Sequence, residues 1–323
     1  MTDRYLLPLP CPAADGPRLA GGWLRFDRVL ALRRGGAAEV VDVRELGPDA
    51  LAPLAAPRPD VAGIAMDRPS VMGILNVTPD SFADGGAHLS IEAALAQADR
   101  MGEAHILDVG GESTRPGATE VPAAEEAARV RPVLAALAGR RVSIDTRKAS
   151  VARAALGMGA TMVNDVSALA HDPAMAATVA ASGAWVCLMH SSPLPAGADP
   201  ADAALDVHDA LAAAVARAEA AGIARERILV DPGIGFAKPA AANLAILRRI
   251  GLLHGLGVPI LLGVSRKGFI GAVSGEAEAR ARMPGTLAVT LAAVAQGVQM
   301  HRVHDVGAIA QGLALWRAVH GLD

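Results

Sequence analysis

Short apolar runs alternate with longer segments of helical period from residue 70 to the end of the chain. Each run precedes a polar turn and then an Ala-rich amphipathic stretch, such as residues 91–101 or 240–253. This alternation predicts parallel strands joined by right-handed helical crossovers. The expected strands are residues 71–77, 106–109, 142–145, 161–166, 185–189, 228–230, 259–264 and 300–303.

Eight strand–helix units in about 250 residues predict an α/β fold of the TIM (β/α)8 barrel type. The main alternative is an open doubly wound sheet, which usually has five or six strands. A polar residue ends every run, and these residues lie about 33 positions apart on average. A closed barrel brings all of them to one mouth, whereas an open sheet spreads them along an edge. They are Asn76, Asp108, Asp145, Asn164, His190, Asp231, Ser265 and His304.

The first 60 residues differ from the rest and are rich in Pro and Gly. Two β-leaning runs, residues 23–32 and 38–43, flank Arg33-Arg34-Gly35-Gly36 and predict a hairpin, although a helix at residues 30–32 stays open. Residues 47–60 carry four prolines and are typical of a linker. We therefore expect an N-terminal extension and linker over residues 1–60 and a barrel domain over residues 61–323.

Composition excludes several classes of protein. Of the 323 residues, 52% are apolar and 20% are charged, so a large core is available. Four Phe, three Trp and one Tyr disfavour a protein that stacks single-stranded bases, and a net charge of −3 attracts neither nucleic acid nor an anionic membrane. No apolar stretch reaches the length of about 18 residues that a membrane span requires. Two distant cysteines form no metal-ligand pair, and we expect a cytoplasmic protein.

The loops after the first two runs are long for strand–helix connections, which is typical of binding loops. Asn76 ends the first strand, where its amide oxygen suits a hard cation such as Mg²⁺, although a helix-capping Asn is the alternative. Thr114 and Arg115 lie in the second loop, ahead of Pro116-Gly117. The planar guanidinium of Arg115 suits phosphate, and a solvated surface loop is the alternative.

The polar residues fall into two chemical sets. Arg115, Arg302, His304 and a cation at Asn76 would neutralise a polyanion such as pyrophosphate, and Arg302 and His304 share a strand face. The second set would grip a flat heterocycle through carboxylate, amide and ammonium groups, although Asp145 could equally cap the following helix. Its members are Asp145, Asn164, Asp231 and Lys267. Zinc-protease and dinucleotide-binding motifs do not occur.

These motifs together resemble the dihydropteroate synthase family. Residues 75–86 and 111–118 are similar to its two signature regions. The agreement covers roughly residues 70–312 and continues through Asp145, Asn164-Asp165, Asp231-Pro232-Gly233, Ser265-Arg266-Lys267 and Arg302-Val303-His304-Asp305. The resemblance implies a TIM barrel, usually dimeric, that condenses 6-hydroxymethyl-7,8-dihydropterin diphosphate with 4-aminobenzoate and releases pyrophosphate.

The same resemblance assigns roles residue by residue. It implies that Asn76 binds Mg²⁺, that Thr114 and Arg115 meet substrate, and that Arg302 and His304 hold the diphosphate. Asp145, Asn164, Asp231 and Lys267 would hold the pterin. Ser265, Phe236 and Pro116 would border the aminobenzoate. The catalytic residues would be Arg115, Lys267, Arg302 and His304.

Two departures from the family and two alternative functions accompany this prediction. The first 60 or so residues exceed the short bacterial form, and residues 190–200 lack the expected Met/Gln pattern. One alternative is a pterin-dependent methyltransferase that serves a corrinoid protein. It has no use for Thr114-Arg115 or for the anion cluster at Arg302 and His304. The other is a non-catalytic pterin-binding paralogue, which the presence of every candidate ligand disfavours.

Overall fold

The computed structural model describes residues 4–11, 13–77, 87–113, 119–195 and 199–322. Eight parallel strands form one sheet in the order β10-β11-β4-β5-β6-β7-β8-β9. Its ends meet, because Val230 bridges Ile260 and the Val230 amide donates to the Pro259 carbonyl at 3.0 Å. The predicted TIM barrel is therefore confirmed over an open sheet. The strands are β4 (Ser70–Asn76), β5 (Ile106–Gly110), β6 (Val142–Asp145), β7 (Met162–Asp165), β8 (Trp185–Met189), β9 (Ile228–Asp231), β10 (Leu261–Leu262) and β11 (Met300–Val303).

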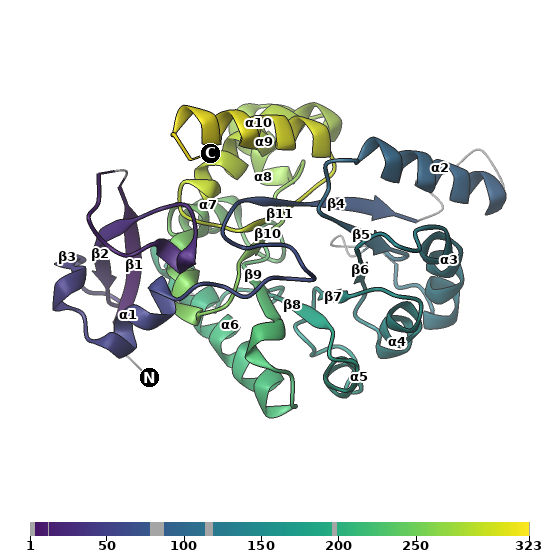
Figure 1. Cartoon of the computed structure of the whole chain (residues 1–323), viewed down its shortest axis with the longest axis horizontal. Coiled ribbons are helices and arrows are strands. Elements are labelled where there is room, and N and C mark those ends of the chain that lie inside the picture. Colours follow the sequence, from purple (N-terminus) through teal and green to yellow (C-terminus); the bar gives the residue numbers. More distant parts are fainter. Residues whose placement is uncertain (1–3, 12, 78–86, 114–118, 196–198, 323) are drawn as a thin grey trace.

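Helices surround the strands (Figure 1). No helix in the described ranges is long and apolar enough to cross a membrane. The α-helices are α2 (Ala87–Arg100), α3 (Ala123–Ala136), α4 (Ala149–Gly157), α5 (Met175–Ser182), α6 (Ala203–Ala220), α7 (Ala240–Arg248), α8 (Gly268–Ser274), α9 (Met283–Val294) and α10 (Val306–Val319). The 3-10 helices between them are η4 (Pro200–Asp202), η5 (Arg225–Arg227), η6 (Ile250–Leu256) and η7 (Ala279–Arg282).

Along four of the strands, the positions that face the barrel interior change from apolar to polar. Its lower layer is one buried cluster, closed from below by Val61, Ile64 and Met66. Because side chains alternate with a period of two, the residue two positions further on faces the same interior. Met72, Ile106, Met162, Cys187, Leu229, Leu261 and Met300 form the lower layer. Two positions on lie Asp108, Asn164, Asp231 and Arg302. The strands therefore carry an apolar floor and a polar mouth.

The N-terminal extension forms an antiparallel sheet in the order β1-β2-β3, beside the barrel near α6 and α7 (Figure 1). Strands β2 (Phe26–Leu32) and β3 (Glu39–Asp42) pair as the predicted hairpin. Strand β1 (Tyr5–Pro10) is not among the predicted elements, and its Pro8 and Pro10 lack amide donors. It is an edge strand with a register shift between these prolines, and such a position tolerates them. Tyr5 donates to Asp209 of α6 at 2.7 Å.

The prediction of a linker at residues 47–60 is wrong for its first half. Residues Pro48–Ala55 form the helix α1, with the short 3-10 helices η1 (Leu19–Gly21) and η2 (Val43–Glu45) before it. Pro48 occupies the first turn, where the missing amide costs nothing, and Leu54 is 1% exposed in a small core with Phe26 and Val29. Burial of Leu54 overrides the breaking effect of the prolines.

Candidate active site

Polar side chains from four strands meet in one hydrogen-bonded set at the mouth of the barrel. The Arg302 guanidinium donates from Nε to Asp108 Oδ2 at 2.6 Å and from Nη2 to Asp145 Oδ2 at 2.7 Å. The Asn164 amide donates to the same Asp108 oxygen at 3.0 Å. Since the neighbouring strands β5, β6 and β7 end at one level, their polar residues face Arg302 of β11 across the interior. We call these four residues the carboxylate set.

Burial governs the electrostatics of the carboxylate set. One guanidinium faces two carboxylates, so the set carries excess negative charge when both are ionised. Burial raises the pKa of Asp145 to about 7; Arg302 opposes this rise and Asp108 adds to it. The Oδ1 atoms of Asp108 and Asp145 are buried without a hydrogen-bond partner among the described residues. A buried acceptor without a partner is costly, so this arrangement suits a ligand with N–H donors.

Asp231 and Lys267 form the facing part of the mouth. The Asp231 carboxylate accepts the Gly233 amide at 2.7 Å. A Cβ atom on Gly263 would lie 3.6 Å from Asp231 Oδ2 and 3.9 Å from Arg302 Cβ, so the absence of a side chain opens the space between Asp231 and Arg302. Burial raises the pKa of Asp231, and the Lys267 charge opposes this rise.

The Lys267 ammonium is held from the β9–α7 loop. Its Nζ donates to the Ile234 carbonyl and lies 4.4 Å from the centre of the Phe236 ring. Burial lowers the pKa of Lys267 to about 8, although the Asp231 charge acts in the opposite direction. Lys267 is therefore a cationic donor close to neutral pH, in contact with the ring of Phe236.

The ends of β10 and β11 are joined through Ser265 and His304. The His304 amide donates to Ser265 Oγ at 3.1 Å, and the His304 Nδ1 atom lies 2.9 Å from the same oxygen. Arg266, between Ser265 and Lys267, has a φ of +59° and donates to Asp305 Oδ2 at 2.9 Å. Its guanidinium is therefore paired with Asp305.

Asn76 offers a single oxygen ligand for a cation. A Cβ atom on Gly110 would lie 3.7 Å from Asn76 Oδ1 and 3.4 Å from Asp145 Cβ, so the amide oxygen borders the carboxylate set. No group of three His, Cys, Asp or Glu side chains that could hold a metal occurs in the described part of the chain. Mg²⁺ commonly takes one or two protein oxygens and completes its shell with water and substrate phosphate. The amide oxygen of Asn76 fits this way of binding Mg²⁺.

The structure brings most of the predicted residues to one mouth. Thr114, Arg115 and Pro116 lie outside the described residues. The division into two sets is less sharp than expected, because Arg302 donates to Asp145, a member of the predicted pterin set. Those brought together are Asn76, Asp145, Asn164, Asp231, Phe236, Ser265, Lys267, Arg302 and His304.

Sequence reasoning assigned no role to several residues of this region. Asp108 was recognised only as a strand end, yet it receives both Arg302 and Asn164 and is fully buried. Glu112 accepts a hydrogen bond from Lys148 Nζ at 2.7 Å and from the Val121 amide at 3.1 Å. The second bond joins Glu112 to a residue nine positions later in the chain. The sequence signal that could have indicated Glu112 is its place in the motif Gly111-Glu112-Ser113, directly after a strand.

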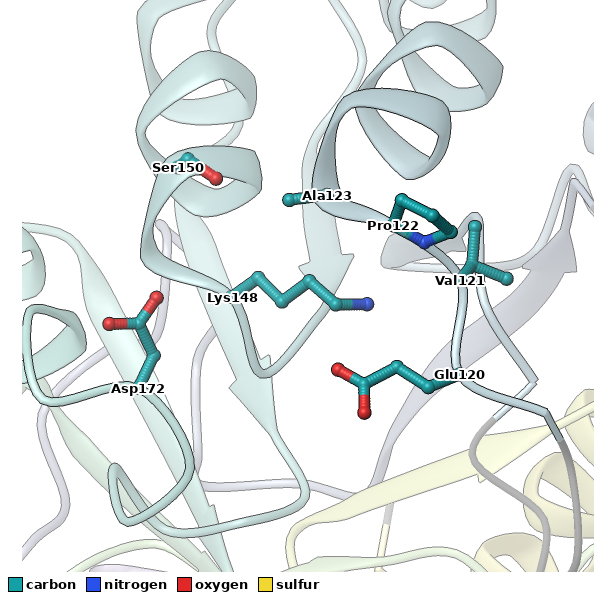
Figure 2. A pocket seen from close by; sticks show the side chains of 7 residues that line it. All are labelled: Glu120, Val121, Pro122, Ala123, Lys148, Ser150 and Asp172. Atoms are coloured by element: carbon teal, nitrogen blue, oxygen red, sulfur yellow. The ribbon is translucent and has the colours of Figure 1, made fainter.

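A pocket of about 460 Å³ lies beside the mouth, between α3, α4 and the loop that precedes α5 (Figure 2). The Lys148 side chain extends across it toward the segment Glu120–Ala123 (Figure 2), and its Nζ also donates to Glu126 at 2.6 Å. None of the predicted site residues that the structure describes lines this pocket. It is lined by Glu120, Val121, Pro122, Ala123, Lys148, Ser150 and Asp172.

Comparisons with known proteins agree with this geometry. The family model described as pterin binding enzyme matches residues 72–304. The chain is 44% identical over 269 residues to a dihydropteroate synthase of Neisseria meningitidis serogroup B, covering 79% of this chain and 94% of that protein. It is 43% identical over 250 residues to the Escherichia coli dihydropteroate synthase, covering 75% and 88%.

Solved structures are similar as well. A Xanthomonas albilineans dihydropteroate synthase with 4-aminobenzoic acid superposes with a TM-score of 0.75 at 46% identity, covering 81% of this chain and 98% of that one. The dihydropteroate synthase of the same organism in complex with 7,8-dihydropteroate gives a TM-score of 0.73 at 43% identity, with the same coverage.

Proposed function

The chain belongs to the dihydropteroate synthases, the pterin-binding transferases that condense 6-hydroxymethyl-7,8-dihydropterin diphosphate with 4-aminobenzoate, and we propose that the barrel mouth carries out this reaction. The carboxylate set is the observation that carries the proposal. It offers two buried carboxylate oxygens that have no hydrogen-bond partner among the described residues, beside a guanidinium and an amide. A flat amino-heterocycle has the N–H groups and ring acceptors that match them.

The pterin is held between the carboxylate set and Asp231. In this proposal Asp145 and Asp231 accept N–H bonds from the ring, Asn164 meets a mixed edge, and Lys267 donates to a ring carbonyl or nitrogen. The support is geometric and electrostatic. Asp231 and Arg302 approach each other across Gly263, and the positive charge of Lys267 opposes the rise in the pKa of Asp231. Loss of water from such a site strengthens each of these bonds.

The diphosphate is bound by Arg115, Arg302 and His304 at the rim, with Thr114 as a further contact. The residue that fits Mg²⁺ is Asn76, and a bound Mg²⁺ would neutralise the charge that grows on the departing pyrophosphate. The Arg302 side chain is 20% exposed, so the guanidinium that binds Asp108 and Asp145 also faces the mouth. Preorganised cations of this kind lower the barrier because they need no rearrangement during the reaction.

The charge distribution favours departure of pyrophosphate before attack. The methylene carbon becomes positive as the C–O bond breaks, and the electron-rich pterin ring shares that charge. Ionised Asp145 and Asp231 stabilise it electrostatically. The arylamine then attacks from the side bordered by Ser265, Phe236 and Pro116, forming the C–N bond and losing one proton. This amine needs little assistance from a base.

Release of pyrophosphate tests the proposal directly. Purified protein, the pterin diphosphate and Mg²⁺ are incubated with and without 4-aminobenzoate, and pyrophosphate and dihydropteroate are measured. We expect dihydropteroate only when both substrates are present, formed together with pyrophosphate in every turnover. Pterin binding without product would indicate the non-catalytic paralogue, and methyl transfer to a corrinoid acceptor would indicate the methyltransferase.

The homodimer, the cytoplasmic location and the division at residue 60 stay predictions. The dimer follows from the family resemblance, and light scattering of the purified chain measures it. A mass of 32.8 kDa for the single chain is the reference value. A barrel that folds without residues 1–60 would support the division.

A further inference from the structure

The chain uses lysine at only three positions. Of its 30 basic residues, 27 are Arg, and the lysines are Lys148, Lys238 and Lys267. Each follows a barrel strand on the side of the mouth, and each is buried or half-buried. Where a basic side chain is exposed, this chain uses Arg. An ammonium is compact and a guanidinium is planar, so the two groups are not interchangeable at a buried site.

Lys238 has such surroundings. Its Nζ donates to the main-chain carbonyls of His190 and Gly233 at 2.9 Å each, and to that of Phe236 at 3.1 Å. An ammonium has three N–H donors and no acceptor, so three carbonyl oxygens around one nitrogen satisfy all three donors. A guanidinium is flat and spreads its donors over several nitrogens. It cannot serve three acceptors that converge on one point.

The backbone of the loop around Lys238 turns tightly, and the ammonium of Lys238 binds the carbonyls at its centre. Gly233, Gly235 and Ala237 have φ values of +64°, +80° and +47°, and the value for Ala237 is strained for a residue with a Cβ atom. Asn243 fixes the far end, since its Oδ1 accepts the Gly235 amide at 2.8 Å and its Nδ2 donates to the Lys238 carbonyl at 3.0 Å. The ammonium holds together carbonyls that this tight turn brings close to one another.

The same loop touches Lys267. It presents the Ile234 carbonyl and the Phe236 ring to the Lys267 ammonium. We propose that Lys238 is a positioning residue for the reaction: it ties the end of β8 to the β9–α7 loop and so holds Phe236 and Lys267 in place against Asp231. This inference rests on the proposed function. It extends that function to a lysine whose ammonium donates to main-chain carbonyls.

Charge provides an independent sign of this role. The groups that face Lys267 are Asp231 at the end of β9, Arg302 on β11 and Lys238 in the loop. Burial lowers the pKa of Lys267 to about 8, and Lys238 contributes in the same direction because it is a like charge. Removal of the Lys238 charge should therefore raise the pKa of Lys267. A Lys238 that lay too far from Lys267 to position it would leave that pKa unchanged.

Three substitutions separate geometry from charge: Lys238→Met removes both, Lys238→Gln keeps donors without charge, and Lys238→Arg keeps charge without the compact shape. Arg44→Lys is the control, because Arg44 is 86% exposed on the N-terminal extension. Thermal unfolding shows whether each variant folds. Initial rates with 4-aminobenzoate varied at saturating pterin diphosphate give kcat and KM.

We expect Lys238→Met and Lys238→Arg to lose at least about ten-fold in kcat/KM for 4-aminobenzoate, since a displacement of about 1 Å can cost a hundred-fold. Arg44→Lys should match the parent protein. Kinetics of Lys238→Arg equal to those of the parent protein would overturn the inference. If Lys238→Met does not fold, Lys238→Gln takes its place. We then expect the same loss of at least about ten-fold in kcat/KM for 4-aminobenzoate.

The titration of Lys267 gives a second readout that does not depend on activity. Lysine labelled with ¹³C at Cε gives three signals in this chain, and Lys267→Arg identifies the one from Lys267. We expect the pKa of Lys267 to rise by about half a unit or more in Lys238→Gln. An unchanged pKa would contradict the inference. Absence of dihydropteroate from the parent protein would instead refute the proposed function, and the titration would still decide the role of Lys238.

Discussion

Replacement of Arg302 by Met should destabilise the protein much more at alkaline than at acidic pH. The guanidinium makes two charge-assisted hydrogen bonds, of 2.6 Å to Asp108 and 2.7 Å to Asp145, and its side chain is 20% exposed. Its removal leaves two buried carboxylates without their cation. Breaking a buried pair in this way costs about 3–5 kcal/mol.

The pH dependence follows from the direction of the Asp145 shift. Burial already raises the pKa of Asp145 to about 7 in the folded protein, above an unfolded value of about 3.9. This carboxyl therefore costs stability as pH rises from about 4 through 7, because the folded state must give up a proton that it holds more tightly. Loss of Arg302 raises the pKa of Asp145 further. The cost of the substitution should be largest above pH 8 and smallest near pH 5.

Urea unfolding of the parent protein and Arg302→Met at pH 5 and pH 8 measures this difference. Arg34→Met is a matched control, because Arg34 also bridges two carboxylates, Asp206 and Asp209, but is 41% exposed. Exposed pairs contribute at most about 1 kcal/mol. A loss for Arg302→Met that is equal at both pH values, or no larger than that for Arg34→Met, would refute the buried carboxylate set.

Two further substitutions test the ligands. Asp231→Asn should weaken pterin binding at least about ten-fold while changing the affinity for 4-aminobenzoate much less, because a neutral amide replaces a charged acceptor; calorimetry giving the reverse order would contradict the assignment. Asn76→Ala should raise the Mg²⁺ concentration that gives half-maximal pyrophosphate release, since an oxygen ligand is lost. An unchanged Mg²⁺ dependence would remove Asn76 from the proposed metal site, and removal of Mg²⁺ by EDTA should slow the parent protein.

The polar mouth could be predicted because strand ends are local features. A run such as residues 142–145 ends in Asp145, and a closed barrel brings such ends together whatever their exact neighbours are. The role of Asp108 could not be predicted in this way. Its partners, Asn164 and Arg302, lie on other strands, and only the register of the closed sheet brings them to one carboxylate.

Other differences arise where tertiary packing overrides a local signal. The four prolines of residues 47–60 indicated a linker, yet the burial of Leu54 stabilises a helix over residues 48–55. No role for Lys238 could be predicted from the sequence. Its ammonium donates to the carbonyl of His190 at the end of β8, 48 residues earlier. The sequence alone does not show that this carbonyl lies beside the loop.

A crystal structure with the pterin bound tests the central claim most directly. We predict a ring that lies above the apolar floor of the barrel, with N–H groups within hydrogen-bond distance of Asp145 Oδ1 and of Asp231. A pterin bound in the pocket beside Lys148, with both of these carboxylates left without ligand contacts, would contradict it.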